Sequence, residues 1–182
     1  MNIFYLSNDP VECAKMHVDK HCVKMILEYA QLLSTAHRLL DGKQQTVLSE
    51  TGRKKKVWML DDERNAILYA ATHVNHPSNV WARASAANYK WLFQLFVALL
   101  SEYEYRYGRT HATSRLKSAL ASAPKNIAGG HFTQPTPAMP VEYIISNDSI
   151  QSYKNYYLGG KAKMFAWKKR EMPAWISQSS LQ

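Results

Sequence analysis

The sequence predicts an all-α protein, a single-domain helical bundle over residues 1–182 with a short N-terminal extended segment and a long proline-rich loop. Apolar residues recur at helical spacing over most of the chain, and glycine or proline interrupts the pattern at intervals. The chain is 46% hydrophobic and 20% charged, which is typical of a globular domain of this length. Residues 168–182 form a predicted basic tail.

The N-terminal third is expected to form an extended lead-in, one long helix and an exposed connection. Residues 3–6 are apolar and indicate a strand or an extended segment. Residues 7–10 offer capping side chains followed by proline, which is typical of a helix start. A helical pattern then runs over residues 10–40, and Gly42 ends it. Residues 43–56 are polar and predict an exposed loop or hairpin.

Four further helices are predicted after this connection. Each begins at a capping side chain or a break and ends at another break. Residues 124–140, which contain Gly129-Gly130 and several prolines, are expected to form an extended loop. The expected helices span residues 61 or 62 to 72, 78 or 79 to 107 (stopped by Gly108), 111 to 123, and 148 or 149 to 167.

The net charge and the cysteine content indicate which kind of binding partner and which cellular compartment to expect. The formal net charge is +9 and the pI about 9.5, which favours a polyanionic partner, nucleic acid first (DNA above all) and an acidic membrane surface second, although some basic proteins bind no anion. Cys13 and Cys22 lie about 13 Å apart along one predicted helix, so both are expected to be reduced in a cytoplasmic setting. Residues 1–5 show no signal peptide, and the apolar stretch 91–100 is too short to span a membrane.

A stripe of polar side chains follows one face of the first predicted helix. Its spacing of three and four residues places all members near one direction, beside the apolar face that must meet the core. Together they offer imidazole, amine, carboxylate, amide and hydroxyl groups, an inventory suited to proton transfer. An ordinary solvated stripe with ion pairs is the alternative. The polar stripe consists of His17, His21, Lys24, Glu28, Gln31 and Thr35.

Two chemistries fit the polar stripe. In the first, Lys24 is a nucleophile that attacks a sugar C1′ or a carbonyl, and Glu28 is the general acid/base. In the second, His17 and His21 are metal ligands. Their partner would come from the set His73, His76 or Asp19. The sequence does not identify the third ligand, so we assign no metal and no cofactor.

Two other segments are candidates for substrate binding. Residues 73–83 combine a helix entry with Asn75, His76 and Arg83, which suggests a phosphate pocket, although His76 and Asn79 can also be simple caps. Near the C-terminus, aromatic residues alternate with cations, a combination typical of nucleic-acid binding. An amphipathic last helix with its aromatic rings in the core is the alternative. The candidates in this segment are Tyr153, Lys168, Lys169 and Arg170.

About thirty residues resemble a known family. Residues 14–17 and residues 153–162 (Tyr-Lys-Asn-Tyr-Tyr-Leu-Gly-Gly-Lys-Ala) are similar to the helical phage pyrimidine-dimer DNA glycosylases of the endonuclease V type. The whole chain also resembles phage-encoded proteins to which no chemistry is assigned. The family uses the α-amine exposed by removal of Met1, whereas the large Asn2 is expected to retain Met1 here. The family's catalytic glutamate would fall near Lys24 by spacing, and its arginine cluster has no match in the first helix.

The resemblance implies base-excision chemistry through an amine and a carboxylate, and Lys24 with Glu28 is the version that the spacing offers. We therefore expect a DNA glycosylase or glycosylase/AP lyase acting on a damaged or modified base near the polar stripe. In this scheme the base is contacted by His17, His21, Asn75 and Gln31. The phosphates are contacted by the cations Arg83, Lys168, Lys169 and Arg170. The alternatives are a nucleotide- or base-modifying enzyme with a histidine-built metal or phosphate site, and a non-enzymatic basic protein that binds nucleic acid.

Overall fold

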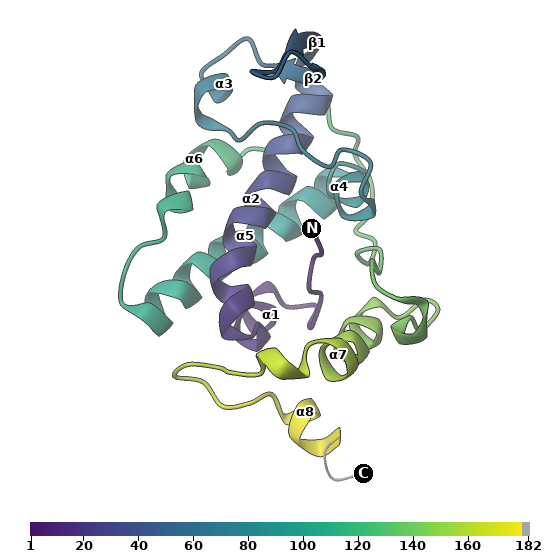
Figure 1. Cartoon of the computed structure of the whole chain (residues 1–182). Helices are drawn as coiled ribbons and strands as arrows, with labels where there is room; N and C mark the ends of the chain where they lie inside the picture. The colour runs from purple at the N-terminus through teal and green to yellow at the C-terminus, as the bar shows by residue number, and fades with distance from the viewer. Residues whose placement is uncertain (180–182) are drawn as a thin grey trace.

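Helices dominate the structure, and one antiparallel hairpin accompanies them, so the fold is mostly helical rather than purely α (Figure 1). The computed structural model describes residues 1–179; the last three residues of the predicted basic tail lie outside them. The α-helices and strands are α1 (Pro10–Met16), α2 (Asp19–Asp41), β1 (Lys43–Leu48), β2 (Lys54–Met59), α3 (Arg64–Ile67), α4 (Pro77–Ala82), α5 (Ala86–Tyr107), α6 (Lys117–Leu120), α7 (Ser149–Gly160) and α8 (Ala174–Ser179). Short 3-10 helices are η1 (Ala112–Leu116), η2 (Val141–Tyr143) and η3 (Ala162–Met164).

The long first helix predicted over residues 10–40 is two helices. α1 ends at Met16, and His17 takes an extended conformation before α2 begins. The cause is the fully buried Arg106 of α5, whose guanidinium donates to the Lys15 carbonyl at 3.0 Å and the His17 carbonyl at 2.8 Å. It also pairs with Asp19 at 3.0 Å. Local periodicity continues across the break, so a sequence window does not detect it.

Tertiary contacts shorten the later helices as well. The helix expected over 61–72 is reduced to the single turn α3, because Arg38 takes the carbonyls of Leu68 and Tyr69 at 2.9 and 2.6 Å. The helix expected from residue 78 to 107 divides into α4 and α5, where Ser85 caps the second part by accepting from the Asn88 amide. Gly108 ends α5 with φ 67°, as predicted. The expected helix 111–123 is η1 followed by α6.

The C-terminal segments also differ in length from the expectation. Asp148 caps α7 as predicted, accepting from the Gln151 amide at 3.0 Å, but the helix ends at Gly160 rather than at residue 167. Residues 124–140 contain no helix or strand, which confirms the proline-rich loop. Among the described residues, no helix has the length and apolar character needed to cross a bilayer.

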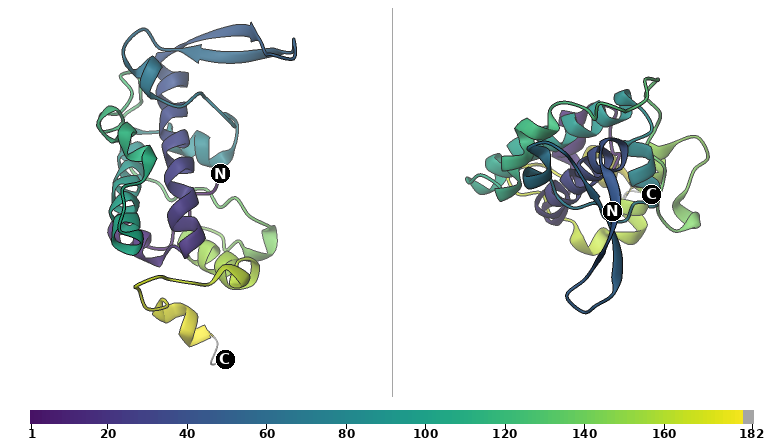
Figure 2. Two further views of the ribbon diagram at one scale, coloured as in Figure 1. Left: turned by 60° about the vertical axis from the view of Figure 1, so that its left-hand side comes forward. Right: turned by 90° about the horizontal axis from the view of Figure 1, so that it is seen from above.

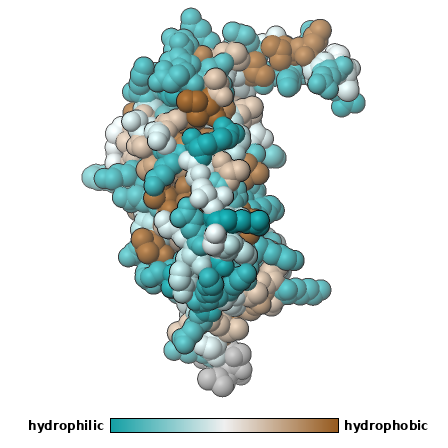
Figure 3. All heavy atoms as spheres, turned by 90° about the vertical axis from the view of Figure 1, so that its left-hand side faces the viewer, coloured by the Kyte–Doolittle hydropathy of each residue, from teal (hydrophilic) through white to brown (hydrophobic). Residues whose placement is uncertain are grey.

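α2 is the central element of the fold. α5 packs against one side of it, with α1 also on α5, while the N-terminal segment and α4 lie on the other side (Figures 1 and 2). α7 lies across the N-terminal end of α2, and the β1–β2 hairpin leaves its C-terminal end (Figure 2). In the space-filling view the hairpin stands clear of the body (Figure 3).

Candidate functional site

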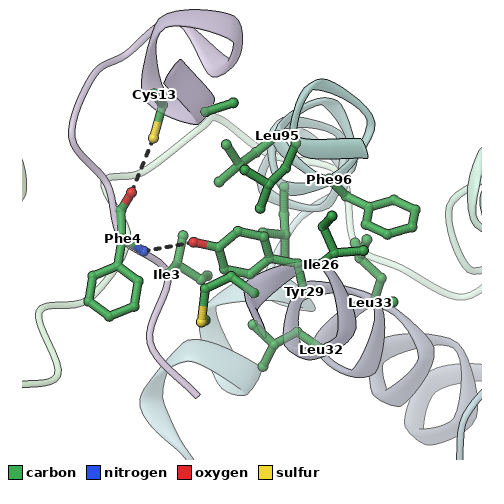
Figure 4. Packing of buried hydrophobic residues seen from close by; sticks show 14 of the residues in the cluster. Ile3, Phe4, Cys13, Ile26, Tyr29, Leu32, Leu33, Leu95 and Phe96 are labelled. Atoms are coloured by element: carbon green, nitrogen blue, oxygen red, sulfur yellow. Dashed lines mark hydrogen bonds between the residues drawn. The ribbon is translucent and has the colours of Figure 1, made fainter. Parts of the chain in front are cut away.

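The N-terminal segment is the first part of the site, because it runs through the interior. Residues 3–6 are buried, with exposed fractions of 4% or less, and they form no strand. A hydrogen-bonded chain of buried groups fixes their position (Figure 4). The Phe4 amide donates to the Tyr29 hydroxyl at 3.1 Å, and that hydroxyl lies 2.7 Å from His17 Nε2. The Cys13 thiol donates to the Phe4 carbonyl at 3.1 Å.

The tautomer of His17 follows from its partners. Its Nδ1 lies 2.7 Å from the Cys13 carbonyl, which can only accept, so Nδ1 carries the proton. Nε2 is then an acceptor, and the Tyr29 hydroxyl donates to it. Burial, followed by the nearby positive charge of Arg106, lowers the pKa of His17 to about 4, although the Cys13 carbonyl opposes this shift. His17 is therefore neutral at pH 7 and has no free nitrogen.

The buried segment brings the chain's α-amine to Glu28. The Met1 nitrogen lies 3.2 Å from Glu28 Oε1, and the two side chains are 6% and 14% exposed. Glu28 Oε2 and Asn2 Oδ1 are both buried, and neither has a hydrogen-bond partner among the described residues. Lys24 Nζ is 3.8 Å from Oε2, and its side chain is 70% exposed. The Met1 amine and the Glu28 carboxylate thus meet in a largely buried place, with the exposed Lys24 at its edge.

His76 also belongs to this neighbourhood. As the cap of α4, its Nδ1 accepts from the Ser78 amide at 3.1 Å. Burial lowers the pKa of His76, the positive Met1 amine and His73 lower it further, and Glu28 opposes them. These electrostatic effects place His76 near the amine and Glu28. The structure therefore brings Glu28 of the polar stripe near His76, which lies at the helix entry predicted within residues 73–83.

His21 lies beside the site but inside the core, covered by α7. Its Nδ1 is 2.7 Å from the Tyr157 hydroxyl, and its ring stacks on Phe4 with centroids 4.0 Å apart. Burial is the main cause that lowers the pKa of His21 to about 2, and electrostatic interactions with His17, Lys161 and Lys24 lower it further. It is therefore a neutral imidazole at pH 7, and two lysines lie close enough to act on it electrostatically.

The polar stripe is not one continuous surface. His17 has left the helix, and His21 and Thr35 are buried, at 3% and 0% exposed. α7 covers the start of the stripe, and the Thr72 amide donates to Thr35 Oγ1 at its far end. Only Lys24 is fully exposed, while Glu28 and Gln31 are half-buried. Long-range contacts thus bury half of a pattern that resembles an amphipathic surface.

The histidine metal site predicted as an alternative does not match this geometry. Both nitrogens of His17 are engaged by Cys13 and Tyr29, and Asp19 pairs with Arg106. Within residues 1–179, no three or more His, Cys, Asp or Glu side chains are grouped as metal ligands would be.

Arg83 supports its own segment of backbone. Its Nη2 donates to the Val74 carbonyl at 2.7 Å, while Nη1 is buried without a partner in the described chain. Asn79 holds the same turn through the carbonyls of Thr72 and His73, each at 2.8 Å. Asn75 is exposed. The predicted phosphate pocket is therefore mostly a hydrogen-bonded turn that positions His76.

The predicted C-terminal nucleic-acid contacts have other surroundings. Tyr153 is fully buried and donates to the Thr136 carbonyl at 3.1 Å, so it cannot stack on a base. Arg170 forms two hydrogen bonds to Glu102, at 2.9 and 3.0 Å, which neutralise its charge. Lys168 and Lys169 are exposed and lie over tyrosine rings of α5. These two lysines therefore lie against α5, whereas Tyr153 belongs to α7 and packs near Phe4.

Sequence reasoning missed the Met1 amine as a partner of Glu28. The signal available was the apolar run of residues 3–6, which must be buried and therefore draws the chain terminus to the core. Comparisons with protein-family models, curated proteins and solved structures found no match. The candidate site consequently rests on the residues and their geometry.

Proposed function

We propose that the protein is a DNA glycosylase or glycosylase/AP lyase that acts on a damaged or modified base through the Met1 α-amine and Glu28. The observation that carries this proposal is the 3.2 Å contact between these two groups in a largely buried setting. The α-amine can act as a nucleophile once the adjacent Glu28 carboxylate accepts its proton. Lys24 is a poorer candidate, because water solvates its exposed ammonium.

The proposed reaction begins with transfer of a proton from the ammonium to Glu28. The free amine attacks C1′ of the deoxyribose; the N–C1′ bond forms, and the bond from C1′ to the base breaks. The base leaves with that electron pair and takes the proton that Glu28 accepted. Glu28 then accepts a proton from the attached nitrogen, the nitrogen lone pair breaks the C1′–O4′ bond to give an iminium, and O4′ takes that proton. In a lyase, a base removes a C2′ proton and the 3′ phosphate leaves with the electron pair of the C3′–O bond.

Neighbouring groups support this role for the pair. Glu28 Oε2 has no hydrogen-bond donor in the described chain, and Lys24 Nζ lies 3.8 Å from it, so this oxygen can accept a further hydrogen bond from a donor that reaches it. The neutral His76 lies near the amine and adds a polar group without adding positive charge at pH 7. Lys24 is exposed at the edge of the pair, where its positive charge can contact a DNA phosphate.

Borohydride trapping with peptide mapping tests the proposal. The protein is incubated with duplex DNA that carries an abasic site or a pyrimidine dimer, reduced and digested, and the cross-linked peptide is identified by mass spectrometry. We expect the adduct on the Met1 α-nitrogen. An adduct on Lys24 instead would assign the reaction to the pair first expected from sequence, and no adduct with either DNA would refute the amine mechanism.

Substitutions at the pair separate its two members. Glu28→Gln keeps the size of the side chain but removes proton transfer, so adduct formation is expected to fall by about 100-fold or more. Lys24→Ala is the matched control on the same helix face and is expected to retain most of the adduct. Thermal denaturation of both variants shows whether the loss at Glu28 reflects chemistry or unfolding. Equal adduct yields from the two variants would remove Glu28 from the mechanism.

A further inference from the structure

The β1–β2 hairpin is a rigid, strongly basic arm. Its strands pair in register from Lys43 opposite Met59 to Leu48 opposite Lys54. Hydrogen bonds close the turn, where the Ser49 amide donates to the Arg53 carbonyl at 2.7 Å and Ser49 Oγ accepts from the Arg53 amide at 3.1 Å. The arm therefore has a defined shape, although it stands away from the body (Figures 2 and 3).

Four consecutive cations occupy the turn and the start of β2. They are Arg53, Lys54, Lys55 and Lys56, all exposed, and Glu50 is the one acidic residue between residues 43 and 59. No ion pair within residues 1–179 neutralises any of the four. Cross-strand pairing places Lys54 and Lys56 on one face of the arm, beside Leu48 and Thr46.

The base of the arm is anchored to α2 by Arg38. This side chain is 6% exposed, and Nη1 donates to the Trp58 carbonyl at 2.8 Å and to Asn65 Oδ1 at 2.9 Å. The backbone of Gly42, at the start of the arm, packs so closely that an added Cβ would lie 2.5 Å from the Arg38 carbonyl oxygen. The arm is therefore held at a fixed angle to the helix that carries Glu28.

The arm points to the side of α2 on which Met1 lies. Both views in Figure 2 place the hairpin and the N-terminus on the same side, with α5 and α6 on the other. Glu28 and the start of the arm are separated by about four turns of α2, or roughly 21 Å along the helix axis. That length corresponds to about six base pairs of duplex DNA at 3.4 Å each.

We propose that the β1–β2 hairpin enters the major groove of duplex DNA and holds it across the Met1–Glu28 face. The choice of DNA rests on the proposed function, whereas the geometry of the arm is independent of it. A two-stranded ribbon fits the B-form major groove, and the cations on its turn then lie at the phosphates. Gln44, Gln45 and Thr46 supply hydrogen-bonding side chains on the exposed strand β1. A-form RNA has a narrow major groove that excludes such a ribbon.

Salt-dependent binding to undamaged duplex DNA tests the arm. Lys54→Ala/Lys56→Ala removes two charges from one face, and Lys90→Ala/Lys117→Ala removes two exposed charges elsewhere. For the arm variant we expect the slope of log K against log salt to fall by about two, which corresponds to about 60-fold weaker binding at 0.1 M salt. The control variant is expected to keep the wild-type slope. Equal slopes for the two variants would overturn the proposal.

Two further measurements separate the outcomes. On an RNA duplex of the same sequence the arm variant and the wild type are expected to bind alike; a loss on RNA equal to that on DNA would refute groove insertion. On a duplex with fewer than about six base pairs on each side of an abasic site, we expect equal borohydride trapping by both proteins. If the arm variant is trapped less than the wild type on this short duplex, the arm does not act only through DNA contacts distant from the abasic site, and the proposed role is refuted. Failure of trapping in the wild type, with an intact binding difference, would refute the amine mechanism and leave the arm supported.

Discussion

Removing one hydroxyl from the core tests the hydrogen-bonded chain that holds the N-terminal segment. In Tyr29→Phe the Phe4 amide loses its acceptor at 3.1 Å and His17 Nε2 loses its donor at 2.7 Å. Both groups stay buried, because Phe4 is 4% and His17 0% exposed. A buried polar group left unpaired costs about 1–3 kcal/mol, so the loss of two partners is expected to lower the free energy of unfolding by about 2–6 kcal/mol.

Urea unfolding measures this loss, and amide exchange at Phe4 locates it. Tyr105→Phe is the matched control, because the Tyr105 hydroxyl donates to a backbone carbonyl at 3.2 Å but the residue is 47% exposed. The control is expected to change the stability by less than about 0.5 kcal/mol. If the two variants lose the same stability, or if exchange at Phe4 stays at the wild-type rate in Tyr29→Phe, the Tyr29 hydroxyl does not hold the segment and the reasoning fails.

Two further predictions concern the folded state. Burial lowers the pKa values of His17 and His37 to about 4, so the unfolded chain binds protons before the folded one as the pH falls below 6.5. The stability that these two histidines contribute is expected to be fully present above pH 6.5 and to decrease down to about pH 4, with a slope of up to about 1.4 kcal/mol per pH unit for each histidine. Urea unfolding at a series of pH values measures it. Gly42→Ala places a Cβ 2.5 Å from the Arg38 carbonyl oxygen, so it is expected to cost about 1–3 kcal/mol in thermal unfolding. Gly129→Ala, with no atom within 4 Å of the added Cβ, is expected to be neutral, and equal melting temperatures for the two would contradict this steric account.

The sequence predicted an element correctly where residues a few positions apart determine the local structure. The polar segment after α2 forms a hairpin, Gly108 ends α5, and Asp148 begins α7, each through turn or capping chemistry confined to a few residues. The proline-rich loop is likewise free of regular structure. These features depend on short-range hydrogen bonds, which the sequence displays directly.

The sequence did not reveal features that depend on contacts between distant residues. The break after α1 depends on Arg106, about ninety positions away, and the burial of His21 depends on Tyr157, 136 positions away. The pairing of Met1 with Glu28 follows from the burial of an extended segment that no helical period describes. Spacing alone paired Glu28 with Lys24, one turn earlier on the same helix, and gave no indication of the Met1 amine, which lies nearer to Glu28 at 3.2 Å.

The hydrogen bond from α7 to the start of α2 has a consequence for folding during synthesis. The Tyr157 hydroxyl meets His21 at 2.7 Å, and the Trp167 indole donates to the Met16 carbonyl at 2.9 Å, across 136 and 151 positions. At 5–20 residues per second, the ribosome adds about 140 residues in roughly 7–28 s. Throughout that interval the nascent chain exposes an apolar N-terminal segment whose final cover has not been made. Chaperones that bind exposed apolar strands therefore have a defined period in which to act on this chain.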